Sequence, residues 1–327
     1  MAELMTAEQY DEYVARRKHR AAVARGLGTA LRHFVLVVVG LTMLMPFTWM
    51  CLASLKDLDE VEQVNPFPRA SHLTECVKAA EARAARTPWS RGGPPAGWLV
   101  GFLGTFFGNY GKVFEQIPFH RYYFNSVFVA AWVTFLQTLT SAMAAYAFAR
   151  LRWPGRDTVF KLYLGTLMVP GVVTMIPNFT LVVKLHFLDT YSGLIVPAAF
   201  TAFGTFLLRQ FMLTIPLALD EAARIDGANH WQIFWNVVMP LARPGVITLM
   251  IFTFMGNYGS FFWPLVLIKS EHLRTLPIGM LFFDSSYGRQ TNLIMAASVM
   301  NIIPLIILFV CTQRFIVKGI QLGAVKG

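Results

Sequence analysis

The sequence predicts an all-α integral membrane protein with six transmembrane helices. Hydrophobic residues make up 55% of the 327 residues and charged residues only 14%, whereas soluble domains carry roughly 25% charged residues. Six apolar runs are long enough to cross the hydrocarbon core, which takes about 20 residues. Lysine and arginine gather beside these runs, as they do at cytoplasmic membrane flanks. The formal net charge of +10 therefore indicates such flanks and argues against a nucleic-acid partner.

The first third of the chain is expected to hold a cytoplasmic helix, one span and a long external segment. Residues 1–32 are polar, with acidic residues first and basic residues last, which suits a helix dipole. Residues 33–55 form the first predicted span. Residues 56–121 are predicted to lie outside, since long segments are translocated largely regardless of their charge. The apolar run 98–107 is too short to span.

Residues 122–318 are predicted to form a core of five further transmembrane helices, followed by a cytoplasmic tail at 319–327. The predicted spans are 122–149, 158–183, 193–213, 245–268 and 293–317. Kinks are expected where proline interrupts the backbone ladder, at Pro170, Pro177 and Pro304. The short basic connections lie on the same side as the basic N-terminal segment, and this identifies that side as the cytoplasm. Both termini are therefore expected to be cytoplasmic.

The connection 209–244 is too patterned to be a plain loop. A short helix is predicted to start near Pro216 and to end at Asp226-Gly227, because glycine readily takes the left-handed conformation after a helix. A second helix should present one apolar stripe and stop at Pro240. The members of that stripe are Trp231, Phe234, Trp235 and Val238. The residues alone leave two interpretations open: a knob gripped by a protein cleft, or an amphipathic hairpin lying on the membrane.

The spacing within this connection resembles a known sequence signature. Glu221-Ala222-Ala223, then Gly227 after three residues, then Val237-x-Met239-Pro240 after nine, is similar to the EAA loop of bacterial ABC importer permeases. The string EAARIDGA is similar to the carbohydrate branch of that family. The external stretch is longer than is usual in the family, with an insertion around 74–107. Residues 258–260 also depart from the family's usual Trp-Asn-Asp.

The resemblance implies a transport subunit of the bacterial inner membrane, without catalysis of its own. Its coupling residues would seat in a groove of a separate ATPase: Glu221, Ala222, Ala223, Arg224, Asp226, Gly227 and Pro240. It also implies two ATP-binding subunits that hold ATP and magnesium, a second permease subunit of different sequence, and an extracytoplasmic solute-binding protein. The chain lacks a G-x-x-x-x-G-K phosphate loop of its own.

Polar residues within the spans are candidates for a substrate pathway, because polar groups at membrane depth pair with one another or face a cavity. They are Asn125, Gln137, Asn178, Asn257, Tyr258 and Asn301. Hydrogen bonds between helices are the alternative explanation for each of them. No cysteine or histidine spacing suggests a metal site.

Two functions from other classes remain as alternatives. An ion-coupled secondary transporter would need buried acidic residues, and the predicted spans are almost free of them. A membrane-embedded enzyme would need convergent His, Asp or Glu side chains at membrane depth, and His186 stands near a span end without an evident partner.

Overall fold

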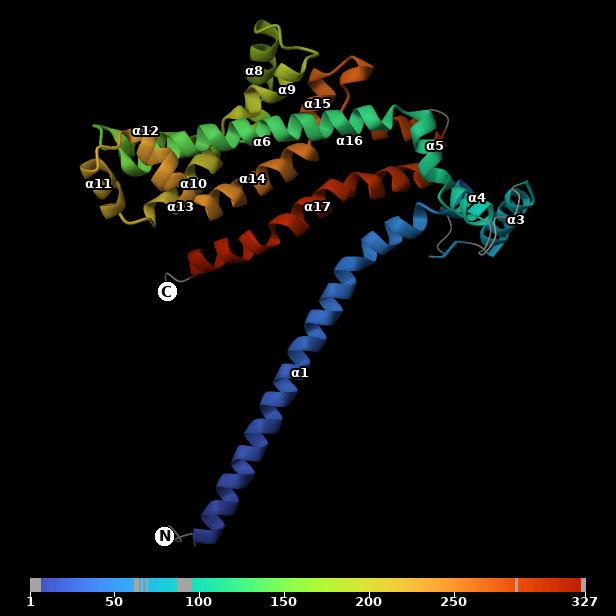
Figure 1. The fold of residues 1–327 in the computed structure, drawn as a ribbon, viewed down its shortest axis with the longest axis horizontal. Coiled ribbons are helices and arrows are strands. Elements are labelled where there is room, and N and C mark those ends of the chain that lie inside the picture. The colour runs from blue at the N-terminus through green and yellow to red at the C-terminus, as the bar shows by residue number, and fades with distance from the viewer. Residues whose placement is uncertain are drawn as a thin grey trace. The chain divides into compact units, whose positions relative to one another are not determined.

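The computed structural model describes residues 7–61, 65, 67–68, 70–86, 96–285 and 288–324, and nearly all of them are helical (Figure 1). This confirms the predicted all-α fold class. The chain divides into two compact units, Met1–Phe106 and Phe107–Gly327. Each unit is described by itself.

The first unit contains α1 (Ala7–Ala53), α2 (Leu58–Val61), α3 (Ala70–Arg86) and α4 (Ala96–Phe106). The second begins with α5 (Gly108–Gln116), α6 (Phe119–Arg150), α7 (Arg156–Gly165), η1 (Thr166–Met168), α8 (Gly171–Lys184), α9 (Tyr191–Ile195), η2 (Pro197–Ala199) and α10 (Ala202–Leu213). It continues with α11 (Ala218–Ile225), α12 (His230–Gln232), η3 (Ile233–Val238), α13 (Met239–Leu241), α14 (Arg243–Tyr258) and α15 (Phe262–Leu267). Its last elements are η4 (Glu271–Leu273), α16 (Leu276–Gly279), η5 (Met280–Phe283), the two-residue strands β1 (Asp284–Ser285) and β2 (Gly288–Arg289), and α17 (Thr291–Ala324).

Helix α1 joins two segments that the sequence analysis separates. It runs without a break across residue 32, because no proline stands between residues 7 and 45 to interrupt its ladder. The part Gly26–Ala53 is long and apolar enough to cross a membrane. The predicted boundary between residues 32 and 33 is therefore a change of polarity within one helix and not a structural boundary.

The long segment after the first predicted span is also helical. Helix α3 packs against α4, and Cys76 and Ala80, which lie one turn apart on α3, are fully buried. The predicted insertion around 74–107 thus contains most of α3 and the whole of α4. Its residues 87–95 lie outside the described part of the chain.

Helix α6 organises the second unit. It has 32 residues with no glycine or proline among them, so nothing in its sequence bends the backbone. Its side chains take part in three successive buried apolar clusters, which gather α5, α16 and α17 near its start, α8, α9 and α15 along its middle, and α10, η3 and α14 near its end. Figure 1 shows α5 at one end of α6 and α11 at the other.

Two of the predicted spans are bent, and a third bent helix pair joins the end of the connection 209–244 to the predicted span 245–268. Three helices are long and apolar enough to cross a membrane, and the described residues allow up to six spans if each bent pair counts as one. The bend between Arg156–Met168 and Gly171–Lys184 is 100° and falls at Pro170, where a kink is expected. Tyr191–Ala199 and Ala202–Leu213 meet at 43°, and His230–Leu241 and Arg243–Tyr258 at 78°.

The predicted span 245–268 also differs from the structure. Helix α14 ends at Tyr258, and α15 begins only at Phe262. Gly259 and Ser260 stand in the gap between them. The weak helix propensity of glycine allows the chain to turn there.

Glycine lets α10 approach its neighbours closely. A Cβ atom on Gly204 would lie 2.5 Å from Ser141 Oγ on α6 and 3.2 Å from Leu249 Cδ1 on α14. A Cβ atom on Gly245 would lie 2.5 Å from the ring of Phe211. These contacts leave no room for a larger residue at either position, so the end of α6, α10 and α14 form one packed body.

Candidate functional site

The connection between α10 and α14 folds as a helical hairpin. We call residues 214–242 the hairpin; it contains α11, α12, η3 and α13. It is shorter than the predicted loop 209–244 because α10 extends to Leu213 and α14 begins at Arg243. In Figure 1 it lies at the end of α6 where that helix terminates, and the C-terminal end of α17 points the same way.

The turn of the hairpin is closed by backbone hydrogen bonds. Gly227 has φ = 84°, as the sequence predicts for this position. The N–H of Ala228 donates to Ala223 O at 2.9 Å, and the N–H of Gly227 donates to Arg224 O at 3.0 Å. These two bonds form a Schellman motif, which fixes the direction in which the chain leaves α11.

A capping box starts the next helix at once. Asn229 Oδ1 accepts from the N–H of Gln232 at 2.9 Å, and Gln232 Oε1 accepts from the N–H of Asn229 at 2.8 Å. Only Ala228 separates this box from the glycine turn. The capping box was not predicted from the sequence, although a capping residue followed three residues later by Gln is a known signal for the start of a helix. The hairpin therefore turns through a rigid link.

The second half of the hairpin presents a different face from the one predicted. Phe234 and Val238 are buried, but Trp231 and Trp235 are 57% and 48% exposed, and Ile233 is buried instead. The reason is the π-helical turn η3, whose wider spacing shifts the buried positions away from a 3.6-residue period.

The sequence predicts that the second helix stops at Pro240, and the helix ends one residue later, at Leu241, where the chain bends by 78° before α14. Pro240 itself stands just before this end. It lies within α13, and α14 follows after Ala242. Proline has no N–H for the helical ladder, and its ring crowds the carbonyl four residues earlier. The π turn directly before Pro240 widens the backbone and relieves that crowding.

A buried ion pair attaches the hairpin to α6. Arg150 Nη1 lies 3.7 Å from Asp220 Oδ2, and the two side chains are 1% and 5% exposed. Arg150 Nη2 also donates to Met212 O at 2.7 Å and to Ile215 O at 2.9 Å. These carbonyls lie at the end of α10, where helical donors run out. One guanidinium thus joins the ends of α6 and α10 to the start of α11.

The sequence alone assigns no partner to Arg150 or to Asp220. The side chain of Tyr146 adds an apolar contact, with its ring edge-on to Phe234 at 5.2 Å between centroids. Its hydroxyl, Arg150 Nε and Asp220 Oδ1 have no hydrogen-bond partner within the described part of the chain. The junction is therefore packed, but its polar groups are not fully paired.

The outer face of α11 is exposed and combines small, apolar and charged groups. Ala218, Ala222 and Ile225 share one face by helical spacing, and all three are exposed, Ile225 by 86%. Glu221, Arg224, Asp226 and Gly227 of the predicted coupling set are exposed as well, and so is Pro240 in α13. Ala223 packs partly against the apolar cluster at the end of α6. Such a face has room for the close approach of another protein.

Two of the predicted pathway residues bond to other parts of the chain. Asn125 Nδ2 donates to His272 O at 3.0 Å and to Arg274 O at 2.9 Å, and its Oδ1 accepts from the hydroxyl of Tyr191 at 2.7 Å. Gln137 Nε2 donates to Ala198 O at 2.8 Å. Both amides thus tie α6 to neighbouring segments.

Two other predicted pathway residues meet each other. The hydroxyl of Tyr258, which is 1% exposed, donates to Asn301 O at 3.0 Å. This bond links α14 to α17. Asn301 Oδ1 is buried and has no hydrogen-bond partner among the described residues.

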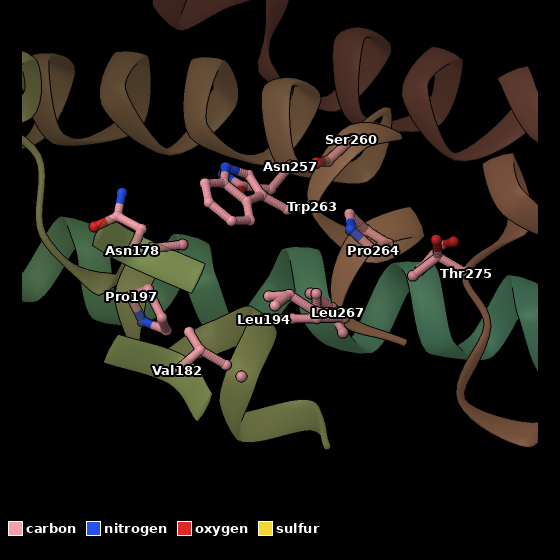
Figure 2. A pocket seen from close by; sticks show the side chains of 14 residues that line it. Asn178, Val182, Leu194, Pro197, Asn257, Ser260, Trp263, Pro264, Leu267 and Thr275 are labelled. Atoms are coloured by element: carbon pink, nitrogen blue, oxygen red, sulfur yellow. The ribbon is translucent and has the colours of Figure 1, made fainter. Parts of the chain in front are cut away.

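The remaining two predicted pathway residues line one cavity of about 120 Å³ (Figure 2). Asn178 comes from α8 and Asn257 from α14. The predicted pathway set does not include four other polar or aromatic members of the lining, Ser126, Ser260, Trp263 and Thr275. Thr275 Oγ1 is buried without a hydrogen-bond partner in the described chain. The cavity therefore offers hydrogen-bonding groups beside one large aromatic ring.

Hydrogen bonds also hold residues 268–274, the loop between the cavity-lining residues Leu267 and Thr275. Asp189 accepts from the side chain of Ser270, from the N–H of Ser270 at 2.8 Å and from the N–H of Lys269 at 2.9 Å. We call these bonds, together with those of Asn125, the loop clamp. The hydrogen bond from the Ser270 hydroxyl and those from the two N–H groups lower the pKa of Asp189.

We expect the loop clamp to be sensitive to acid. Because the pKa of Asp189 is lowered in the folded chain, its contribution is complete above the ordinary Asp pKa of about 3.9 and is lost as the pH falls through the lower folded value. Limited proteolysis of the purified chain between pH 6 and pH 3 should show loss of protection around residues 267–274. In Asp189→Asn, which tolerates the same left-handed backbone (φ = 57°), protection should be weaker at pH 6 and should lack this acid step. Identical pH profiles for both proteins would contradict the assignment.

Comparison with known proteins places these features in a family context. Residues 137–318 match the family model described as binding-protein-dependent transport system inner membrane component. The matched region contains the whole hairpin.

Two curated relatives are similar over most of their length. The arabinooligosaccharides transport system permease protein AraQ of Halalkalibacterium halodurans is 36% identical over 220 residues, which cover 67% of this chain and 79% of that protein. The sn-glycerol-3-phosphate transport system permease protein UgpE of Yersinia enterocolitica is 36% identical over 208 residues, which cover 63% of this chain and 74% of that protein.

A solved structure shares the fold. A chain from the crystal structure of a bacterial ABC transporter involved in the import of the acidic polysaccharide alginate superposes with a TM-score of 0.68. The match covers 90% of this chain and 97% of that chain at 23% sequence identity. At this identity the likeness concerns the fold alone.

Proposed function

Because the chain belongs to the family of binding-protein-dependent transport system inner membrane components, we propose that it forms half of the translocation pathway of an ATP-driven importer for mono- or oligosaccharides. It is itself a transport subunit. ATP hydrolysis, with its magnesium, is assigned to two partner ATP-binding subunits. A second permease subunit of different sequence supplies the other half of the pathway, and an extracytoplasmic solute-binding protein delivers the solute.

The observation that carries this proposal is the exposed face of α11. The EAA sequence pattern lies on a helix of eight residues whose start is anchored by a buried ion pair and whose end is fixed by the Gly227 turn. A small, rigid and exposed helix suits a groove in a partner protein. Its firm attachment to α6 and α10 suits the transmission of force from that partner into the transmembrane core.

This assignment sets the orientation of the chain. The hairpin, with the end of α17, faces the cytoplasm, where ATP is available, and both termini are cytoplasmic. The loop clamp then faces the outside, where the solute-binding protein would dock.

The solute class is inferred from the relatives and from the cavity. The relatives' names refer to arabinooligosaccharides and sn-glycerol-3-phosphate, which are both rich in hydroxyl groups. The cavity offers two amides and three hydroxyl side chains beside Trp263, and sugars are recognised by aromatic faces and directed hydrogen bonds. We propose that Asn178 and Asn257 contact the solute, while Asn125, Gln137 and Tyr258 hold the helices together.

Two variants separate these roles. Asn178→Leu should raise the KM of uptake by roughly tenfold, since losing one buried solute hydrogen bond costs about 1–2 kcal/mol, and should leave thermal stability nearly unchanged. Gln137→Leu, which loses its bond to Ala198 O, should lower the Tm and leave KM unchanged. Uptake kinetics in proteoliposomes and Tm in detergent are measured for both variants. Equal effects of both variants on KM would contradict the assignment.

The function is tested by co-purification and reconstitution. The tagged chain is co-expressed with its neighbouring ATPase, permease and binding-protein genes, and the complex is placed in liposomes. We expect the ATPase and a second permease to co-purify and uptake to require ATP and the binding protein. An ion-coupled secondary transporter is the competing function. Uptake by the chain alone, driven by an ion gradient without ATP, would establish it.

A further inference from the structure

A basic hollow lies where α6 passes into α7. It has a volume of about 400 Å³ and is lined by Arg152, Trp153, Gly155, Arg156, Asp157 and Thr158. We call it the 152–158 hollow. It follows directly after Arg150, so it lies at the same end of α6 as the hairpin.

The charges at this hollow are unbalanced. Asp157 Oδ1 lies 3.0 Å from Arg156 Nε and 3.9 Å from Arg209 Nη2. Arg152 and Lys161 are exposed nearby, and Lys161 is close enough to act on the charge of Asp157. Among the described residues, Arg156, Lys161 and Arg209 thus act on one carboxylate, and Arg152 adds a fourth positive charge to the lining of the hollow. The excess positive charge favours an anion from outside the chain.

The surroundings of the hollow indicate which anion fits. Val159 and Leu162, in the first two turns of α7, are 45% and 70% exposed, and Trp153 is 37% exposed. Exposed aliphatic side chains, a cluster of Arg and Lys, and a partly exposed tryptophan in one short segment are typical of the boundary between acyl chains and headgroups. A ligand with both a phosphate and acyl chains matches both parts of this surface, whereas a free anion matches only one.

We propose that the 152–158 hollow binds the phosphate headgroup of an anionic phospholipid. Arg152 and Lys161 hold the phosphate, Trp153 lies at headgroup depth, and the acyl chains cover Val159 and Leu162. The leaflet involved is the one on the hairpin side, which is cytoplasmic if the proposed function holds. Since Arg209 contacts Asp157 and stacks on Phe160 at 4.1 Å, the bound lipid fixes the start of α7 against α10.

The test is native mass spectrometry of the assembled transporter in equal amounts of phosphatidylglycerol and phosphatidylcholine. Wild type should retain phosphatidylglycerol preferentially. Arg152→Gln with Lys161→Gln should reduce that preference roughly thirtyfold, because each basic residue near an anionic lipid surface contributes a factor of about five. Lys184→Gln is the matched control, since it removes an exposed positive charge from the other end of the same bent span and should change nothing.

Three outcomes would overturn the proposal. The first is equal retention of both lipids by wild type, and the second is unchanged retention in the double variant. The third is displacement of phosphatidylglycerol by millimolar inorganic phosphate, which would make the hollow a site for soluble anions. None of these measurements needs transport or ATP hydrolysis. A wild-type transporter with ATP-driven uptake but no preference for phosphatidylglycerol would therefore refute this inference alone, and a wild-type preference for phosphatidylglycerol without ATP coupling would refute only the proposed function.

Discussion

Gly227→Pro is expected to abolish solute-stimulated ATP hydrolysis while the transmembrane core stays folded. Proline fixes φ near −65°, whereas Gly227 has φ = 84°. Proline also removes the N–H that donates to Arg224 O. The cost, about 3 kcal/mol or more, falls on the turn that sets the end of α11. A Cβ atom on Gly227 would meet nothing within 4 Å, so the core is not disturbed.

The matched control is Gly227→Asn. Asparagine tolerates the left-handed region, and the open space around Gly227 accepts its side chain. We expect this variant to keep its ATPase partner and its coupled hydrolysis. Co-purification, stimulated ATPase activity and Tm are measured together for both variants. Full ATPase retention and stimulation in Gly227→Pro would show that the turn does not position a coupling surface.

Glu221→Lys tests the charge of the same surface without touching the turn. Glu221 is exposed, whereas its neighbour Asp220 is buried, so the reversal should weaken partner binding and leave the Tm unchanged.

The second large effect is expected from Arg150→Met. Removing one partner of a buried ion pair leaves the other charge uncompensated and costs about 3–5 kcal/mol. The carbonyls of Met212 and Ile215 lose their donor at the same time. We therefore expect a strongly lowered Tm in detergent and loss of the ATPase subunit, because α11 is no longer held against α6.

The double variant Arg150→Met with Asp220→Leu separates charge from packing. Replacing both charges by apolar groups removes the uncompensated carboxylate, so much of the lost stability should return. The recovery should be incomplete because the two carbonyls remain without the guanidinium. Equal Tm values for the single and double variants would mean that Asp220 is not an ion-pair partner of Arg150.

The sequence predicts features whose cause lies within a few neighbouring residues. The Gly227 turn follows from one residue's backbone freedom, and α6 follows from a long apolar run without helix breakers. The bend after η1 follows from Pro170. Each of these can be read without knowing what else packs nearby.

Features that depend on distant contacts could not be predicted in this way. Arg150 and Asp220 are 70 positions apart, and nothing in either neighbourhood identifies the other as a partner. The exposure of Trp231 and Trp235 depends on a π turn, which periodicity based on 3.6 residues per turn misplaces. The polar residues of the predicted spans show the same limit. Whether such a residue bonds to another helix or lines the cavity depends on its neighbours in space, which the sequence does not give.

Because α6 is long and contains no glycine or proline, it can transmit a tilt from one of its ends to the other as a rigid rod. From Asn125 to Arg150 the helix covers 25 residues, or roughly 38 Å at 1.5 Å per residue. A tilt of about 10° about the Arg150 end displaces the far end by roughly 7 Å, since no glycine or proline within the helix provides a hinge. Such a displacement exceeds the length of the bonds from Asn125 to His272 O and Arg274 O. The loop clamp must then either move together with α6 or come apart, so a movement imposed at the hairpin end of α6 is transmitted to the loop clamp at its other end.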